Sequence, residues 1–137
     1  MGGSANEIPT DFSFDSSFEY ICGASNSESP NGLPDAHGMS KGSYDVFVIK
    51  VRKSSMGYIW GKFMGISTTE DAGMGCTVDD EGNIFGTGLT NSGAGSYDTY
   101  IWSLYDNGDQ NFVMIAGYSN DDKFASIVFN DQVASDE

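Results

Sequence analysis

Few of the residues that build catalytic sites occur in this sequence, which has one histidine, two cysteines and three prolines among 137 residues. A Ser-His-Asp system needs its histidine held firmly beside a serine. The single histidine, His37, lies instead in a Gly- and Pro-containing segment, 27–42, with no nucleophile elbow around it. We therefore expect no catalytic residue. We interpret 27–42 as a contact loop, with His37 as a candidate for binding a ligand or partner.

Long apolar runs are also absent. No stretch approaches the ~20 apolar residues that a membrane-spanning helix needs. The N-terminal MGGSANEIPT has neither the basic start nor the apolar core of a signal peptide. We expect no membrane insertion and no signal peptide within this sequence.

Positive charge is scarce: Lys and Arg total 6 against 20 Asp and Glu, which gives a net charge of −14. Nucleic acid and anionic membranes both attract clustered Lys and Arg, so neither is an expected partner. An acidic coat keeps β-sheet proteins soluble and suppresses pairing between sheet edges. A salty or extracellular setting and weak calcium binding are the alternative explanations.

The two cysteines, Cys22 and Cys76, fall in separate apolar segments and form no Cys-x-x-Cys pair, which argues against a zinc or redox motif. A buried free thiol is the commoner state for such residues. A disulfide between them is the alternative, although two cysteines do not make a disulfide scaffold.

What the sequence does contain is a series of short alternating segments rich in β-branched and aromatic residues, separated by turn residues such as DDEGN and YDNGDQ. The Gly of each of these two turns suits a position with positive φ. Helical periodicity is nearly absent, and 18 glycines favour turns. The expected strands are 18–25, 45–51, 58–65, 75–79, 83–90, 99–105, 110–118 and 125–131.

The tetrapeptide Gly-Ser-Tyr-Asp occurs at 42–45 and again at 95–98, each time before an apolar segment. Aligning the two occurrences predicts a repeat of four short strands in about fifty residues, as in a propeller blade. The fold class is therefore all-β: two four-stranded antiparallel propeller-type blades plus the first strand of a third, a partial β-propeller. The expected divisions are a disordered tail at 1–10, blades at about 11–74 and 75–125, an extra strand at 126–131 and an acidic tail at 132–137.

The ordered series of turns and strands over 11–131 resembles the bacterial-type β-propeller repeat of cell-surface and secreted proteins. The resemblance implies a non-enzymatic binding or scaffold module that is extracellular or attached to the cell surface. Its partners would be proteins or glycans. The matching residues are Asp79, Gly82, Asn83, Thr87, Gly88, Thr90, Asp98 and Asp122 in the second copy, and Asp15, Gly23, Ser25, Asp45, Trp60 and Asp71 in the first.

The blade count leaves three interpretations open, because closed propellers typically have about four to eight blades. The chain is a fragment of a longer propeller, or a homo-oligomer completes the ring, or the two units pack as a sandwich. Function also has alternatives: a carbohydrate-binding, lectin-like module, or a fragment of a propeller-type enzyme that acts on glycans.

Acidic turns are the candidates for a metal, and calcium is the only cofactor considered. Calcium takes several carboxylate and carbonyl oxygens around one point, but none of these turns has the EF-hand spacing. Asp and Asn in turns more often bond nearby backbone amides. The candidate ligands are Asp79, Glu81, Asp106, Asp109, Asp121 and Asp122.

The further candidates for ligand or partner binding are Tyr44, Asp45, Tyr97 and Asp98, because each copy of the repeated tetrapeptide places them before a strand. Tyrosine rings near strand ends could stack on sugars or hold a protein partner. The two aspartates could line a binding face, or could bond backbone groups at the start of a strand.

Overall fold

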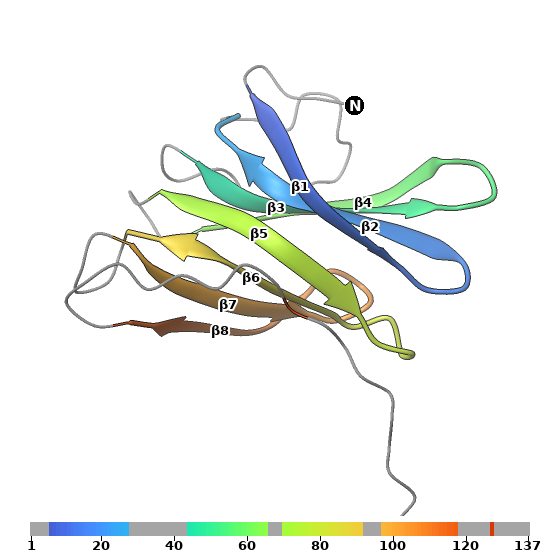
Figure 1. Cartoon of the computed structure of the whole chain (residues 1–137). Helices are drawn as coiled ribbons and strands as arrows, with labels where there is room; N and C mark the ends of the chain where they lie inside the picture. Colours follow the sequence, from blue (N-terminus) through green and yellow to red (C-terminus); the bar gives the residue numbers. More distant parts are fainter. Residues whose placement is uncertain (1–5, 28–43, 66–69, 92–96, 118–126, 128–137) are drawn as a thin grey trace, which may run out of the picture.

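The computed structural model describes residues 6–27, 44–65, 70–91, 97–117 and 127. Its elements are eight antiparallel β-strands in two four-stranded sheets, which confirms the all-β class (Figure 1). The first sheet contains β1 (Glu7–Phe14), β2 (Phe18–Ser25), β3 (Asp45–Arg52) and β4 (Gly57–Met64). The second contains β5 (Asp71–Val78), β6 (Ile84–Thr90), β7 (Asp98–Leu104) and β8 (Gln110–Ala116).

Each sheet is a simple meander, because every strand pairs with the next one along the chain. The tight turns use the expected glycines: Gly82 and Gly108 have φ values of 85° and 86°. Asp45 and Asp98, which end the repeated tetrapeptide, open the third strand of their sheets. Both pair with the last residue of the second strand, Ser25 and Thr90 respectively. The two sheets therefore share one strand plan.

Two boundaries differ from the expectation. Residues 7–10, assigned to a disordered tail, form the start of β1, whose register shifts between Pro9 and Asp11. A bulge on an edge strand tolerates proline, which hid this strand in the sequence. The division between 74 and 75 is also wrong, because it cuts through β5; the two sheets separate between Met64 and Asp71.

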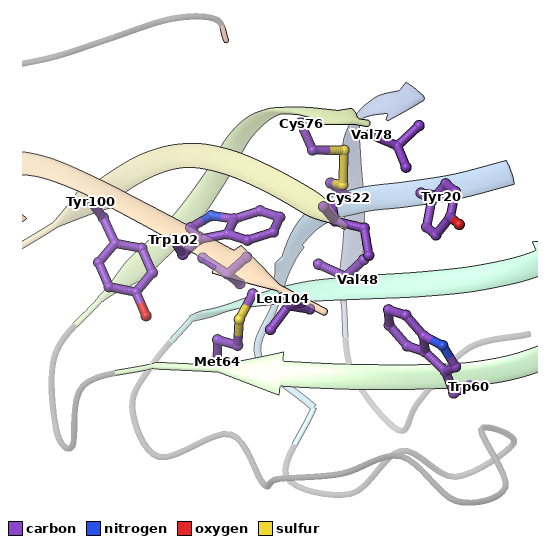
Figure 2. Close-up of a cluster of buried hydrophobic side chains, with 12 residues drawn as sticks. Tyr20, Cys22, Val48, Trp60, Met64, Cys76, Val78, Tyr100, Trp102 and Leu104 are labelled. Carbon is purple, nitrogen blue, oxygen red and sulfur yellow. A yellow bond between two sulfur atoms is a disulfide. The ribbon is translucent and has the colours of Figure 1, made fainter. Parts of the chain in front are cut away.

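The sheets lie face to face, and β5 runs close to β1, β2 and β3 (Figure 1). The side chains between them form the main core, shown in Figure 2. This core contains Tyr20, Cys22, Val46, Val48, Trp60 and Met64 from the first sheet and Cys76, Val78, Ile84, Tyr100, Trp102 and Leu104 from the second.

β3 is buried along both of its faces, from Asp45 to Val51. Its alternate residues Val46 and Val48 point into the main core, whereas Phe47, Ile49 and Val51 form a second cluster with Phe63. Successive strand residues point to opposite faces, so the apolar run from Val46 to Ile49 suits a strand that is covered on both sides.

Covalent and polar contacts join the sheets along β1, β2 and β5. Cys22 and Cys76 form a disulfide across the main core, with their Cα atoms 6.4 Å apart, so the free-thiol interpretation is wrong (Figure 2). Beside it, the Thr10 hydroxyl donates to the Gly73 carbonyl at 2.8 Å. The Cys76 amide donates to the Asp11 carboxylate at 3.0 Å. The first strand of the second sheet is therefore fixed onto the first sheet at several points.

Candidate functional site

The candidate site is a pocket of about 330 Å³ where the starts of β1 and β5 meet. Small-molecule sites typically have volumes of about 300–1,000 Å³, so this pocket is at the lower end of that range. Both sheets contribute to it in the same way: Ile8 and Ala24, paired across β1 and β2, match Ala72 and Leu89, paired across β5 and β6. The described residues that line it are Ile8, Thr10, Ala24, Tyr44, Glu70, Ala72, Gly73, Met74, Leu89 and Tyr97.

Tyr44 and Tyr97, both named from the sequence, line this one pocket. Each stands one residue before the third strand of its sheet, so the face-to-face packing of the sheets brings the two tyrosines to the same cavity. The backbone helps to hold this arrangement, because the Asp71 amide donates to the Tyr44 carbonyl at 2.7 Å and so links β5 to the start of β3.

Glu70 gives the pocket its charge. Its carboxylate accepts a 2.8 Å hydrogen bond from the Tyr97 hydroxyl. Its backbone is held on the β6 side, where the Glu70 amide donates to the Asn91 side chain at 2.9 Å. In the first sheet the Asn6 amide makes the same bond to the Asn26 side chain, also at 2.9 Å. The matching position there holds an asparagine, so the charge comes from the second sheet.

Asp45 and Asp98 do not line the pocket; both are buried at the first residue of their strands. The Asp45 carboxylate lies against Gly65 and the Asp98 carboxylate against Gly117, where any side chain would collide with them. This matched placement supports a structural role for the two aspartates.

Two buried carboxyl groups, those of Asp45 and Asp71, lie near Tyr100 at the end of the core closest to the pocket. Burial, together with the charges of Asp71 and Asp45, raises the pKa of the Tyr100 hydroxyl above its ordinary value. Tyr100 is 2 % exposed, and Asp45 and Asp71 are fully buried. These acids lie inside the protein rather than on a surface that a ligand reaches.

The opposite end of the molecule carries an acidic surface hollow lined by Asp15, Asp80, Glu81 and Asp106. Asp15 closes the β1–β2 turn: its carboxylate accepts bonds from the Ser17 and Phe18 amides and from the Tyr20 hydroxyl. Burial alone would raise the Asp15 pKa. These bonds and the charge of Lys50 outweigh that effect and hold the pKa below its ordinary value.

Lys50 is the buried cation of this end, with 2 % of its surface exposed. Its ammonium group lies 4.2 Å from the centre of the Phe18 ring and pairs with the carboxylate of Asp106. The Asp106 carbonyl also accepts a 3.0 Å bond from the Trp60 indole. Asp106, in the β7–β8 turn, thus anchors the second sheet to the first.

The calcium candidates within the described ranges are engaged in other contacts. Asp79 accepts bonds from the Glu81 and Asn83 amides, and Asp109 accepts one from the Asn107 side chain. Among the residues that the structure describes, no three His, Cys, Asp or Glu residues gather in a group suited to a metal ion. The remaining candidates, Asp121 and Asp122, lie outside the described residues.

Several further expectations also concern parts of the chain outside those residues. They include His37 and the contact loop 27–42 beyond Ser27, the extra strand 126–131 apart from Ile127, and the acidic tail 132–137. Within the described ranges, no helix has the length and apolar character needed to cross a membrane.

Comparison with models of known protein families and with curated proteins found no match. The site therefore has to be interpreted from its own geometry. Sequence reasoning found its two tyrosines and missed Glu70, Ile8 and Met74. The signal that could have found Glu70 is the matched pair of asparagines, Asn26 and Asn91, each of which follows the second strand of its sheet by one residue.

Proposed function

We propose that this chain is a non-enzymatic binding or scaffold module of an extracellular or cell-surface protein. The observation that carries the proposal is the pocket lined by Tyr44 and Tyr97, to which the two sheets contribute matching residues. A cavity built from matched positions needs both sheets, so its existence depends on how they pack. Rigid strands that position aromatic side chains at one end suit recognition.

We further propose that the two sheets are propeller-type blades. Each is a four-stranded meander, and β5, the first strand of the second sheet, lies on the face of the first sheet. Blades of a propeller also stack face to face, and each needs neighbours to cover its faces. The shared start of the third strands, at Asp45 and Asp98, supports a duplicated unit.

The extracellular assignment is supported by the disulfide between Cys22 and Cys76. Disulfides persist in oxidising compartments and are rare in the cytosol. The net charge of −14 agrees with a protein that must stay soluble outside the cell.

A carbohydrate-binding module is the second candidate, favoured by the presence of two tyrosines and an acid, Glu70, in one pocket. Tyrosine rings stack on sugar faces, and a carboxylate accepts bonds from sugar hydroxyls. Sugars also need several polar partners. Most of the lining is apolar, which weighs against this candidate.

The test is a fragment screen followed by ¹⁵N chemical shifts, with neutral, cationic and sugar fragments as the probes. We expect hits to perturb the amides of Tyr44, Tyr97 and their neighbours. Tyr97→Ala, which removes one wall, should abolish those shifts, whereas Tyr105→Ala, an exposed tyrosine that does not line the pocket, should leave them unchanged. A screen without hits at the pocket would contradict the proposal, and hits by sugars alone would favour the second candidate.

A further inference from the structure

The chemistry of the pocket specifies a class of ligand, and the inference below rests on the proposed binding function. The walls are apolar side chains from both sheets: Ile8 and Ala24 from the first, and Ala72, Met74 and Leu89 from the second. Such walls take hydrocarbon and exclude groups that need many hydrogen bonds. The part of the ligand that contacts these walls is therefore apolar.

The polar groups of the lining are few, and most of them have partners. The Thr10 hydroxyl is committed to the carbonyls of Gly73 and Cys22, at 2.8 and 3.3 Å. The Tyr97 hydroxyl donates to Glu70. A carboxylate has two oxygens with about four lone-pair positions, so Glu70 can accept further donors while it holds Tyr97. Glu70 is the acceptor that a ligand would find.

The charge of the site is negative. Glu70 is the one acidic residue among the described residues that line the pocket, and these residues include no Lys or Arg. The whole chain carries −14, so its long-range field attracts cations and repels anions. Tyrosine ring faces also attract cations, which adds Tyr44 and Tyr97 to the groups that favour a positive ligand.

We propose that this pocket receives a long cationic side chain, lysine or arginine, from a partner protein. The hydrocarbon stem lies along the apolar walls and the charged head reaches Glu70 between the two tyrosines. Lysine and arginine combine a hydrocarbon stem and a cationic head in this way. An acidic receptor for basic side chains also gives the surplus of negative charge a role in attracting the partner.

The experiment uses the whole chain and two capped pentapeptides, Gly-Gly-Lys-Gly-Gly and the same peptide with norleucine in place of lysine. The two have the same hydrocarbon stem, and the charge is the main difference. In ¹⁵N titrations the lysine peptide should bind about tenfold more tightly, as expected for a charge-assisted contact. Raising NaCl should weaken the lysine peptide and leave the norleucine peptide unchanged.

Glu70→Gln isolates the charge, because it keeps the shape and the amide that bonds Asn91. It should weaken the lysine peptide about tenfold and leave the norleucine peptide unchanged. The matched control is Glu81→Gln, which removes the same charge from an exposed turn at the other end of the molecule. It should change neither affinity by more than about twofold.

Equal binding of the two peptides, or no effect of Glu70→Gln, would overturn the cation proposal. If fragments from the screen still bind at Tyr44 and Tyr97 while the lysine peptide does not, this inference fails and the proposed function stands. If no probe binds at the pocket, both fail. If the ¹⁵N spectrum shows that Glu70→Gln is not folded, Tyr97→Phe is tested in its place. That variant frees the carboxylate of its tyrosine and should keep the preference for lysine.

Discussion

At the scale of single residues, the ion pair between Lys50 and Asp106 is asymmetric. The Lys50 side chain is 3 % exposed, whereas that of Asp106 is 55 % exposed. A buried ion that loses its partner is costly, but an exposed one returns to water. The consequence of breaking the pair therefore depends on which partner is removed.

We predict that Asp106→Asn destabilises the protein by about 2 kcal/mol, because it removes the charge that pairs with the buried Lys50 ammonium. Lys50→Met should cost about 1 kcal/mol, since methionine fills the same space between Phe18 and Tyr20. The double variant should be no less stable than Lys50→Met alone. Urea unfolding measures all three, and a larger loss for Lys50→Met than for Asp106→Asn would contradict the account.

Asp15 gives a prediction about pH. Its pKa is held below the ordinary 3.8, so its bonds stabilise the fold above that pH and are lost as the pH falls through the lowered value. Asp15→Asn should therefore be less stable than the native protein at pH 6, and the difference should shrink towards pH 2. Thermal melts from pH 6 to 2 measure this. Asp80→Asn, in an exposed turn, is the control. If the stability difference between Asp15→Asn and the native protein stays constant from pH 6 to 2, the lowered pKa of Asp15 is contradicted.

At the scale of elements, close backbone contacts fix where the first strand of each sheet lies. A Cβ on Gly23 would collide with the Ile8 carbonyl, and one on Gly88 with the Ala72 carbonyl. Both glycines belong to the second strand of their sheet and meet the first strand at the same place. The two units therefore share a packing requirement as well as a strand order.

We predict that Gly88→Ala destabilises the protein by about 2 kcal/mol, because a carbonyl of a paired strand cannot move aside as a side chain can. Gly57→Ala is the matched control: its Cβ would meet only the flexible Ser55 side chain. Chemical denaturation should show a loss below about 0.5 kcal/mol for the control. Equal losses in the two variants would argue against the close approach of β5 and β6.

The positions of most strands could be predicted from the sequence. Alternation and turn residues located six strands to within a residue or two, including Phe18–Ser25. β1 was missed because Pro9 and several polar residues obscure its pattern at a bulged edge. The start of β5 was missed because Gly73 and Gly75 flank a register shift. Irregular edge strands have a weak pattern in the sequence, because they pair with a neighbouring strand on one side only.

The site could be predicted less well. The repeated tetrapeptide identified Tyr44 and Tyr97, but only the packing of the sheets brings them to one cavity with Glu70. Strand patterns fix the direction of side chains within a sheet and contain little information about which sheets meet. The same limit applies to Cys22 and Cys76, whose bond joins residues 54 positions apart.

At the scale of the whole molecule, that disulfide links the two sheets through their shared core (Figure 2). Closing a chain segment of 54 residues restricts the unfolded state and stabilises the fold by about 4 kcal/mol. We predict a loss of this size in the Cys22→Ala/Cys76→Ala variant, measured by urea unfolding. A loss below about 1 kcal/mol would contradict the predicted contribution of the bond.

The central claim is that the two sheets stack face to face, which places Cys22 of β2 against Cys76 of β5 and forms the pocket between the tyrosines. The most direct measurement is the intact mass after alkylation with iodoacetamide under denaturing conditions. The protein would be produced in an oxidising compartment and treated with and without a reductant. The account predicts no alkylation without reductant and two additions after reduction. Two additions without reductant would contradict it.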